Sequence, residues 1–453
     1  MTPGARLAAA IEVLADIDAR HRPAGDALKD WGLSHRFAGS GDRAAIAGLV
    51  YDALRRRASA AFLMGEETPR AILLGMLRLE RGLELEAMSR LADGARFAPT
   101  PLSKTERAAL ASATLAGAPP HVAGDYPEWL DPHFARVFGG ERAQEGAALA
   151  SRAPLDLRVN ALKSERETAQ AALAHLAPEP TRWSPLGLRI RLGAEAKNPA
   201  IHAEPAFLKG LIEVQDEGSQ LAALLAGAKP GEQVVDLCAG AGGKTLALAA
   251  AMDNHGQIYA TDTDKRRLAP IHARLERAGA RNVQVRTPRG DADLLADLAG
   301  CADLVLIYAP STGTCAWRRN PDAKWRVRPG ALGIRRQEQA EALDRAVALV
   351  KPGGRIAYVT CSVLEEENGE QIRAFLAHHP DFSLIPPSDV ANALGERAYL
   401  FRRAVLVSAE GLLITPRRTD TDGFFVSLLK RRPDPMRQQV RKKIHRNFKY
   451  MTN

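Results

Sequence analysis

Two loops in the second half of the chain carry side chains that could do chemistry. The first, at residues 236–245, reads Asp-Leu-Cys-Ala-Gly-Ala-Gly-Gly-Lys-Thr and follows a short apolar run. Glycines in such a loop let the backbone approach a ligand closely, and they leave the amides of the following helix facing it. The phosphate-binding pattern GxxxxGK[ST] requires glycine where this chain has Cys238. A nucleotide triphosphatase is therefore disfavoured.

A carboxylate follows the next apolar run. Asp262 lies within Thr-Asp-Thr-Asp at residues 261–264, about twenty positions after the glycine loop. At that spacing a carboxylate can accept hydrogen bonds from a ribose diol, so the loop and the acid together predict adenosine recognition. These residues by themselves leave NAD and S-adenosylmethionine equally open as the ligand.

The elements that must position these loops alternate between strand and helix. Short apolar runs at 234–237, 258–260, 283–285, 304–307 and 355–359 are separated by helical stretches such as 268–277 and 339–350. This alternation predicts an α/β fold with a doubly wound, mostly parallel sheet. In such a sheet the ligand lies beyond the carboxyl ends of the strands, so the loops there are the candidate site.

Two other patterns precede this region. Apolar residues at helical spacing, such as Leu7, Ile11 and Leu14, predict a helical first segment, and Thr68-Pro69 predicts the start of a helix. Alternating runs at 155–160 and 188–192 predict two half-buried strands in a small α+β module. The arginines on their polar face either meet RNA or are simply solvated, and the pattern leaves both open.

Composition narrows the class of protein. The chain has 453 residues, 46% hydrophobic and 25% charged, which excludes disorder of the whole chain. No apolar run approaches the roughly 18–20 residues of a membrane span, so we expect a soluble, unprocessed, cytoplasmic protein without a membrane partner. Four scattered cysteines without a CxxC pair predict neither a disulfide framework nor a metal site.

The positive charge is concentrated at the end of the chain. Residues 430–453 hold nine basic side chains and one acidic, a net +8 of the chain's +9. Such an arm, with Phe448 and Tyr450 among the cations, can neutralise phosphates and stack bases. A solubilising tail explains the same residues, and charge alone does not decide between the two.

The loops after the last two predicted parallel strands carry a family resemblance. They read Tyr-Ala-Pro-Ser-Thr-Gly-Thr at 308–314, Trp-Arg-Arg-Asn-Pro-Asp-Ala-Lys-Trp at 317–325, Thr-Cys-Ser at 360–362 and Glu-Glu-Glu-Asn at 365–368. These residues resemble the Sun-family (Nol/Nop/Sun) RNA cytosine-C5 methyltransferases, particularly the bacterial enzymes that modify 16S ribosomal RNA. Residues 215–220, 351–354 and 421–425 look like further family landmarks in family order, and 35–57 resemble a NusB-like helical domain.

The resemblance implies a covalent reaction. Family members add a cysteine thiolate to C6 of a cytosine, which makes C5 nucleophilic enough to take the methyl group of S-adenosylmethionine. The family nucleophile maps onto Cys361. The cofactor would be held by Cys238, Ala239, Gly240, Ala241, Gly242, Gly243, Lys244 and Asp262, with Asp291 facing the adenine; a plain solvated Asp291 is the alternative.

The resemblance also implies four segments and a partner. We expect a NusB-like RNA-binding domain at 1–140, an α+β RNA-binding module at 141–225, a Rossmann-like methyltransferase domain at 226–432 and the basic tail at 433–453. The partner would be RNA, and we favour a monomer. Arg318, Arg319 and Lys324 would touch RNA phosphates or shape the target pocket, whereas Trp317 and Trp325 would pack.

Two residues depart from the family pattern. Family members usually have Asp-Ala-Pro-Cys where this chain has Tyr308-Ala-Pro-Ser311. Losing one hydrogen-bond donor to the charge that develops on the cytosine raises the reaction barrier by about 3–4 kcal/mol. Ser311 is also a weaker base than the family cysteine, which helps to break down the covalent adduct. Cys315 either replaces that cysteine or packs. The resemblance thus implies the function of an RNA methyltransferase, with a catalytically impaired or inactive RNA-binding homologue as the alternative and an NAD-dependent reductase as a third.

Overall fold

The computed structural model describes residues 1–193, 199–290 and 293–434. The chain divides into two compact units, each described here by itself. Unit 1 comprises Met1–Pro154 and Thr314–Pro329, together with the short stretch after Ile190. Unit 2 comprises Leu155–Ile190, Pro199–Gly313 and the described residues from Gly330 onward. The chain therefore leaves unit 2 at Gly313 and returns to it at Gly330.

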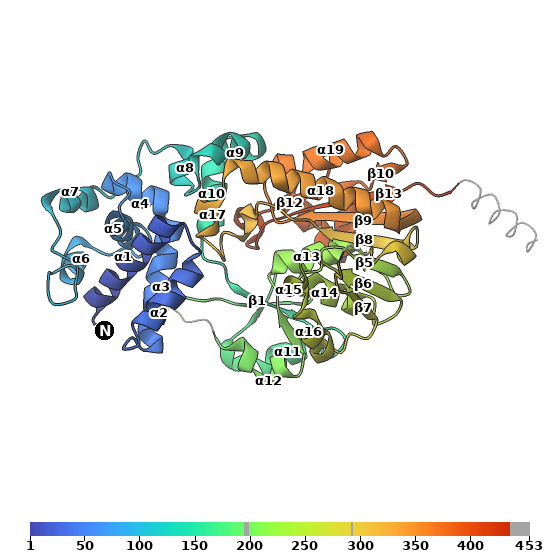
Figure 1. The fold of residues 1–453 in the computed structure, drawn as a ribbon, viewed down its shortest axis with the longest axis horizontal. Helices are drawn as coiled ribbons and strands as arrows, with labels where there is room; N and C mark the ends of the chain where they lie inside the picture. Colours follow the sequence, from blue (N-terminus) through green and yellow to red (C-terminus); the bar gives the residue numbers. More distant parts are fainter. Residues whose placement is uncertain (194–198, 291–292, 435–453) are drawn as a thin grey trace, which may run out of the picture. The chain divides into compact units, whose positions relative to one another are not determined.

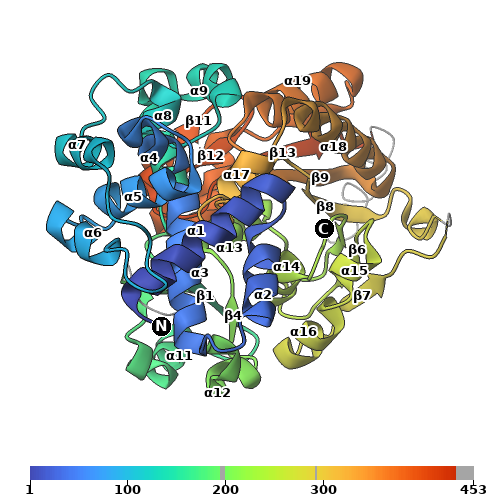
Figure 2. The same ribbon diagram turned by 60° about the vertical axis from the view of Figure 1, so that its left-hand side comes forward.

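Unit 1 is helical, as the sequence predicts. Figure 2 shows its first helices, α1, α3 and α5, packed together in blue, and Leu7, Leu14 and Ile72 are buried in their core. The Thr68 hydroxyl accepts a hydrogen bond from the Ala71 amide at 3.2 Å, which confirms the predicted helix start. Its main helices are α1 (Pro3–Arg20), α2 (Ala24–Ser34), α3 (Ser40–Arg55), α4 (Arg57–Met64), α5 (Pro69–Leu79), α6 (Leu85–Leu91), α7 (Lys104–Ser112), α8 (Pro120–Ala123), α9 (Asp131–Phe138) and α10 (Arg142–Ala150).

The inserted segment 314–329 packs into unit 1 through its tryptophans. Trp317 is buried and its ring stacks on Phe134, with the ring centres 6.2 Å apart. Trp325, on the short helix α17 (Ala323–Arg326), donates from Nε1 to the Leu54 carbonyl at 2.7 Å. The predicted packing role of both tryptophans is confirmed.

Two cations of the same segment are buried as well. Arg318 is 3% exposed and Lys324 is fully buried, with Lys324 Nζ donating to the carbonyls of Arg55 at 2.9 Å and Asp125 at 2.6 Å. Buried cations cannot meet a phosphate backbone. The phosphate-contact alternative is therefore wrong for Arg318 and Lys324, whereas shaping the target pocket stays a prediction; Arg319 is exposed.

A small antiparallel sheet begins unit 2. Its strand order is β2 (Glu179–Pro180), β3 (Gly187–Ile190), β1 (Leu155–Val159) and β4 (Ile212–Val214). The predicted strands form, but the polar face is not solvated: Asp156, Arg158 and Arg189 are 1%, 3% and 5% exposed. Arg189 donates to both oxygens of Asp156 at 2.7 and 2.8 Å. Neither an RNA-facing nor a solvated role holds for Arg158 and Arg189, because α13 (Glu217–Ala226) covers this module.

The second sheet of unit 2 is the predicted doubly wound one. Figure 1 shows its central strands side by side in the order β9, β8, β5, β6 and β7, all parallel. The antiparallel strands β13, β12 and β11 extend it beyond β9, and β10 pairs with β13. The strands are β5 (Gln233–Asp236), β6 (Gln257–Thr261), β7 (Val283–Arg286), β8 (Ala302–Tyr308), β9 (Val350–Thr360), β10 (Phe382–Leu384), β11 (Leu406–Val407), β12 (Leu412–Ile414) and β13 (Phe424–Arg431). This confirms the α/β fold class.

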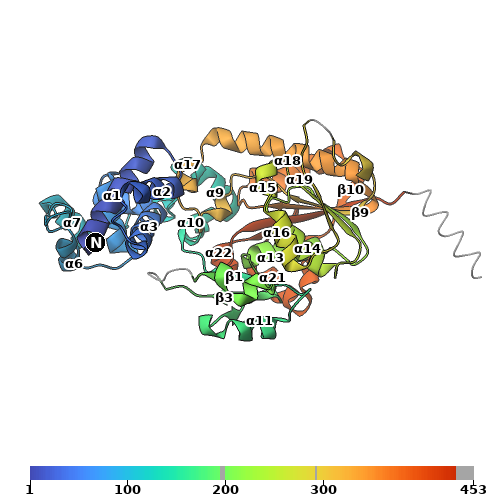
Figure 3. The same ribbon diagram turned by 60° about the horizontal axis from the view of Figure 1, so that its bottom comes forward.

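Helices cover both faces of the parallel strands. Figure 3 shows α13, α14 (Gly243–Ala251) and α16 (Ile271–Ala278) on one face and α18 (Pro329–Leu349) and α19 (Gly369–His378) on the other. The helix predicted at 268–277 is interrupted, because Pro270 separates α15 (Lys265–Leu268) from α16. The remaining helices are α11 (Arg166–Ala172), α12 (Pro205–Leu208), α20 (Pro387–Ala391), α21 (Ala398–Ala404) and α22 (Pro416–Thr419). Within the described ranges, no helix has the length and apolar character needed to cross a bilayer.

The two units differ from the four predicted segments. Unit 1 continues past residue 140 to Pro154, and α10 belongs to it. The chain is not divided at residue 225, because α13 packs on β1 of the small sheet as well as on α14 and β13 of the large one. Most of the predicted tail, residues 435–453, lies outside the described residues.

Candidate active site

The predicted site residues of unit 2 come from the carboxyl ends of adjacent parallel strands. Strand β5 lies between β6 and β8. The connection after β5 runs through α14 on one face of the sheet, and the connection after β8 runs through α18 on the other. This is the point at which doubly wound sheets bind ligands. The glycine loop follows β5, Asp262 follows β6, Tyr308 ends β8 and Cys361 follows β9.

The glycine loop is held against the end of β6. The Ala239 amide donates to the Thr261 carbonyl at 2.8 Å, and the Gly242 amide donates back to the Ala239 carbonyl at 2.9 Å. Gly242 has a φ of 84°, and a Cβ added there would lie 2.5 Å from Ile271 Cγ1. Glycine is thus required at 242 for both its conformation and its close packing.

Two carboxylates flank this loop. Asp262 is 4% exposed and accepts from the amides of Gly240 at 2.9 Å and Asp264 at 3.0 Å, so its position is fixed. Asp236 is 1% exposed; its Oδ2 accepts from the Thr245 hydroxyl at 2.7 Å, and its Oδ1 has no partner among the described residues. Burial raises the pKa of Asp236 to about 6.

Asp262 fits an adenosyl ligand, because it is placed as an acceptor beside a glycine loop. Asp236 is buried and accepts from the Thr245 hydroxyl, so its carboxylate is not exposed to a ligand. The sequence analysis did not name Asp236 as a site residue, although an acid at the end of the strand before the loop was the available signal. Asp291 lies outside the described residues, so its role stays a prediction.

The two cysteines at strand ends differ in their surroundings. Burial, together with the carboxylates of Asp236 and Asp262, raises the pKa of Cys238 to about 12. Its thiol therefore stays neutral. Cys361 is 7% exposed and lies instead within Coulombic reach of the Lys244 ammonium.

The chain on both sides of Cys361 is fixed by hydrogen bonds. Thr360 Oγ1 donates to Asn368 Oδ1 at 2.5 Å, and Asn368 Nδ2 donates to the Ser362 carbonyl at 2.8 Å. The Ser362 hydroxyl donates to the Glu367 carboxylate. Position 361 therefore has little freedom to move relative to β9.

Glu367 joins this loop to the loop after β8. Its carboxylate accepts from the Thr312 amide at 2.8 Å, from the Thr312 hydroxyl at 2.6 Å and from Gln339 Nε2 at 3.0 Å. Gln339 also donates to the Pro310 carbonyl at 2.8 Å. Burial raises the pKa of Glu367, although these hydrogen bonds oppose the rise. The sequence analysis missed this network, because its members are far apart in the chain.

Lys244 lies against aromatic rings. Its Nζ is 3.3 Å from the centre of the Tyr308 ring and 5.1 Å from that of Phe424. Burial lowers the pKa of Lys244 to about 8, against the opposing attraction of Cys361, Asp236 and Asp216. The structure therefore brings together Lys244 and Tyr308, which are far apart in the sequence, and Cys361 follows β9, the strand next to the one that Tyr308 ends.

Two other residues named from the sequence differ in their placement. Ser311 is half-buried in the loop after β8. Cys315 is fully buried and belongs to unit 1, which agrees with the packing alternative.

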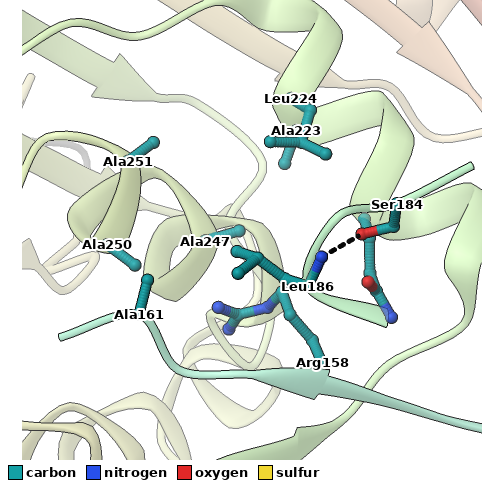
Figure 4. A pocket seen from close by; sticks show the side chains of 10 residues that line it. Arg158, Ala161, Ser184, Leu186, Ala223, Leu224, Ala247, Ala250 and Ala251 are labelled. Carbon is teal, nitrogen blue, oxygen red and sulfur yellow. Dashed lines mark hydrogen bonds between the residues drawn. The ribbon is translucent and has the colours of Figure 1, made fainter. Parts of the chain in front are cut away.

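A cavity elsewhere in unit 2 is separate from these strand ends. It has a volume of about 70 Å³, and Figure 4 shows it lined by Arg158 and by small apolar side chains such as Ala247 and Ala251. None of Cys361, Asp262 and Tyr308 lines it. The strand-end residues therefore define the candidate site.

Comparisons with known proteins agree with this geometry. Residues 222–430 match the model of a family described as 16S rRNA methyltransferase RsmB/F. The "Probable ribosomal RNA small subunit methyltransferase B" of Synechocystis is 31% identical over 312 residues, 68% of this chain and 67% of that protein. The "Ribosomal RNA small subunit methyltransferase B" of Sodalis glossinidius is 36% identical over 307 residues, 66% of this chain and 64% of the relative. The chain thus matches about two thirds of the length of these relatives.

Solved structures share the fold. The crystal structure of PH0851 has a TM-score of 0.68 and 26% identity, covering 95% of this chain and 99% of that one. The structure of NSun6 from Pyrococcus horikoshii with SFG has a TM-score of 0.57 and covers 68% of this chain and 99% of its own; at 21% identity it shows the fold alone.

Proposed function

The chain belongs to the RsmB/F family of 16S rRNA methyltransferases, and on this premise we propose that it methylates C5 of a cytosine in 16S ribosomal RNA through Cys361. The methyl donor would be S-adenosylmethionine. The observation that carries the proposal is the position of Cys361 directly after β9, at the same edge of the parallel strands as the glycine loop after β5 that Asp262 fixes. That arrangement combines a nucleophile with a cradle for an adenosyl ligand.

The cofactor would lie along the glycine loop. When bound, S-adenosylmethionine supplies an electrophilic methyl group. Asp262 would accept from the ribose hydroxyls, and Asp291 would face the adenine. The loop from Cys238 to Lys244 would hold the methionine end. Close packing at Gly242 supports this assignment, because any side chain there would push the loop off its position.

The reaction would begin at Cys361. Its thiol loses a proton to a buffer base, and the thiolate forms a bond to C6 of the cytosine. The bond to C6 would place electron density on C5, so that C5 could take the methyl group while the methyl–sulfur bond of the donor breaks and the donor leaves as a neutral thioether. Transfer of the C5 proton to a base and departure of the Cys361 thiolate from C6 would then restore the C5–C6 double bond.

Tyr308 and Ser311 favour a second candidate function, that of an impaired or inactive RNA-binding homologue. Tyr308 is a poor proton donor, with an ordinary pKa of about 10, and a serine hydroxyl is a weak base for removing the C5 proton. Both substitutions slow the reaction, and Ser311 slows the step that releases the RNA.

The deciding experiment is methyl transfer from tritiated S-adenosylmethionine to 16S ribosomal RNA, with analysis of the nucleosides. Label in 5-methylcytosine that disappears in Cys361→Ala supports the enzyme. RNA binding without any label supports the inactive homologue. If NAD raises the melting temperature and S-adenosylmethionine does not, a reductase is favoured and the proposal fails.

A further inference from the structure

The cavity of unit 2 that lies apart from the strand ends contains the side chain of a buried arginine. Arg158 of β1 lines this cavity together with residues of α13 and α14, two helices that pack against each other. Figure 4 shows its guanidinium among the small side chains of the cavity wall. The volume is about 70 Å³. An engineered cavity of about 150 Å³ holds benzene, so this one has room for a ligand of a few heavy atoms.

The guanidinium of Arg158 lacks the partners that a buried charge needs. The side chain is 3% exposed, and its Nε donates to Gln215 Oε1 at 2.6 Å. Its two Nη groups make no hydrogen bond or ion pair with any of the described residues. Arg189 of the same sheet differs, because Asp156 accepts from both its Nε and its Nη2. A buried cation without such a carboxylate is unfavourable unless another anion compensates it.

The acid that acts most strongly on Arg158 is paired with other arginines. Glu213 of β4 attracts the Arg158 charge, but its carboxylate forms ion pairs with Arg274 at 3.1 Å and with Arg277. Burial lowers the pKa of Arg158 to about 10 against this attraction, so the guanidinium stays protonated at neutral pH. A positive charge is therefore present beside the cavity near pH 7.

Most of the cavity wall is apolar. Seven of its ten lining residues are alanine or leucine, among them Leu186, Ala223 and Ala247. Such a wall cannot solvate an inorganic anion on all sides, whereas it accommodates a hydrocarbon group. A carboxylate on a short alkyl chain satisfies both the cation and the apolar wall.

We propose that this cavity binds a short aliphatic carboxylate, such as acetate or propionate. The carboxylate oxygens accept from the Arg158 guanidinium, and the alkyl end packs against the alanines of α13 and α14. This site goes beyond the proposed function, because it needs neither the methyl donor nor RNA.

Isothermal titration calorimetry of the full-length protein tests the site, with sodium acetate as the probe and acetamide as its uncharged counterpart. We expect saturable binding of acetate and at least roughly tenfold weaker binding of acetamide, which has no charge for the guanidinium. Arg158→Met keeps a long side chain without the charge and should weaken acetate binding by at least roughly tenfold. Arg281→Met is the matched control, since Arg281 is exposed and does not line the cavity.

A second variant tests the cavity without removing the charge. Ala247→Leu places a larger side chain in the α14 wall and should abolish acetate binding. This variant decides the question if Arg158→Met fails to fold. A cavity that holds only water would give no saturable binding of acetate, and that result would overturn the proposal.

Two further outcomes would also overturn it. One is equal acetate affinity in the native protein and in a folded Arg158→Met or Ala247→Leu protein. The other is tighter binding of chloride than of acetate, which would assign the cavity to an inorganic anion. Because the titrations contain no RNA and no methyl donor, their outcome is independent of the methylation assay that tests the proposed function.

Discussion

Thr312 and Glu367, which are 55 residues apart, meet through two hydrogen bonds: the amide and the hydroxyl of Thr312 both donate to the Glu367 carboxylate, at 2.8 and 2.6 Å. This contact joins the loop after β8 to the loop after β9. The first loop carries the unusual Tyr308 and Ser311, and the second carries Cys361. The geometry of the reacting groups therefore depends on a carboxylate that touches none of them directly.

Replacing that carboxylate should cost stability. Glu367→Gln turns one acceptor oxygen into an NH2 group that faces a donor, and hydrogen bonds to charged groups contribute about 1.5–3 kcal/mol. We expect a loss of that size in the free energy of unfolding, measured by urea denaturation. The control is Glu370→Gln, which breaks a more exposed pair with Arg336 and should cost under about 1 kcal/mol. Equal losses in the two variants would contradict the role of Glu367.

Restoring the family residues should accelerate methylation. Tyr308→Asp restores a side chain that can hydrogen-bond to a ring nitrogen of the cytosine. Ser311→Cys restores a stronger base for the step that breaks down the covalent adduct. A well-placed donor to developing charge contributes a factor of about 10² to 10³ in rate. We therefore expect the double variant to methylate RNA faster by at least that factor, with each single variant in between. An unchanged rate would show that our account of both positions is wrong.

The native chain should trap its RNA if it attacks at all. With Ser311 in place of the resolving cysteine, the covalent adduct forms faster than it breaks down. A protein–RNA band that survives a denaturing gel is expected, and it should be absent in Cys361→Ala. A band of equal strength in that variant would assign the bond to another residue.

The buried Lys324 predicts a particular pH dependence of stability. Burial lowers its pKa to about 7, against an ordinary 10.5, so between these values the unfolded chain binds the proton more tightly than the folded one. The free energy of unfolding should rise as the pH increases from about 7 to about 10.5. Below this window Lys324 is protonated in both states and should contribute no pH dependence. Lys324→Met should remove part of the rise, on the order of a few kcal/mol between pH 7 and 10.5.

Urea unfolding at pH 7 and pH 9.5 measures this effect. Lys351→Met is the matched control, since Lys351 is 42% exposed and its removal should leave the slope unchanged. If the Lys324 and Lys351 variants show the same pH dependence as the native protein, burial does not lower the pKa of Lys324 in the folded protein.

The basic end of the chain predicts the salt dependence of RNA binding. Residues 433–453 hold six basic side chains and one acidic, and each phosphate contact adds to the slope of log affinity against log salt. Removing these residues should weaken RNA binding and flatten that slope. A truncated protein that binds more weakly with an unchanged slope would assign the arm to solubility.

The sequence predicted the strands of the large sheet well, because periodicity and loop composition are local. The run at 234–237 overlaps β5, the run at 304–307 falls within β8, and the glycine loop lies between a strand and a helix as expected. The resemblance also pointed to the residues that meet at the strand ends. Such inferences need only short windows of the chain.

What the sequence did not predict depends on contacts between distant segments. Arg158 and Arg189 alternate with apolar residues as solvated strand residues do, yet Asp156 and the covering α13 bury them. Lys324 stands in a run of charged residues, and its burial requires carbonyls from Arg55 and Asp125. The contact between Lys244 on α14 and Tyr308 at the end of β8 likewise joins two segments that no local sequence pattern connects.

The segment 314–329 has a consequence for how such proteins can recombine in evolution. Although it is encoded between two strands of the methyltransferase sheet, its tryptophans and Lys324 complete the interior of the helical unit. A gene fusion that joined the first 154 residues to another catalytic domain would leave behind part of the helical unit's own core. The helical unit therefore depends for its core on a segment that the other half of the chain supplies.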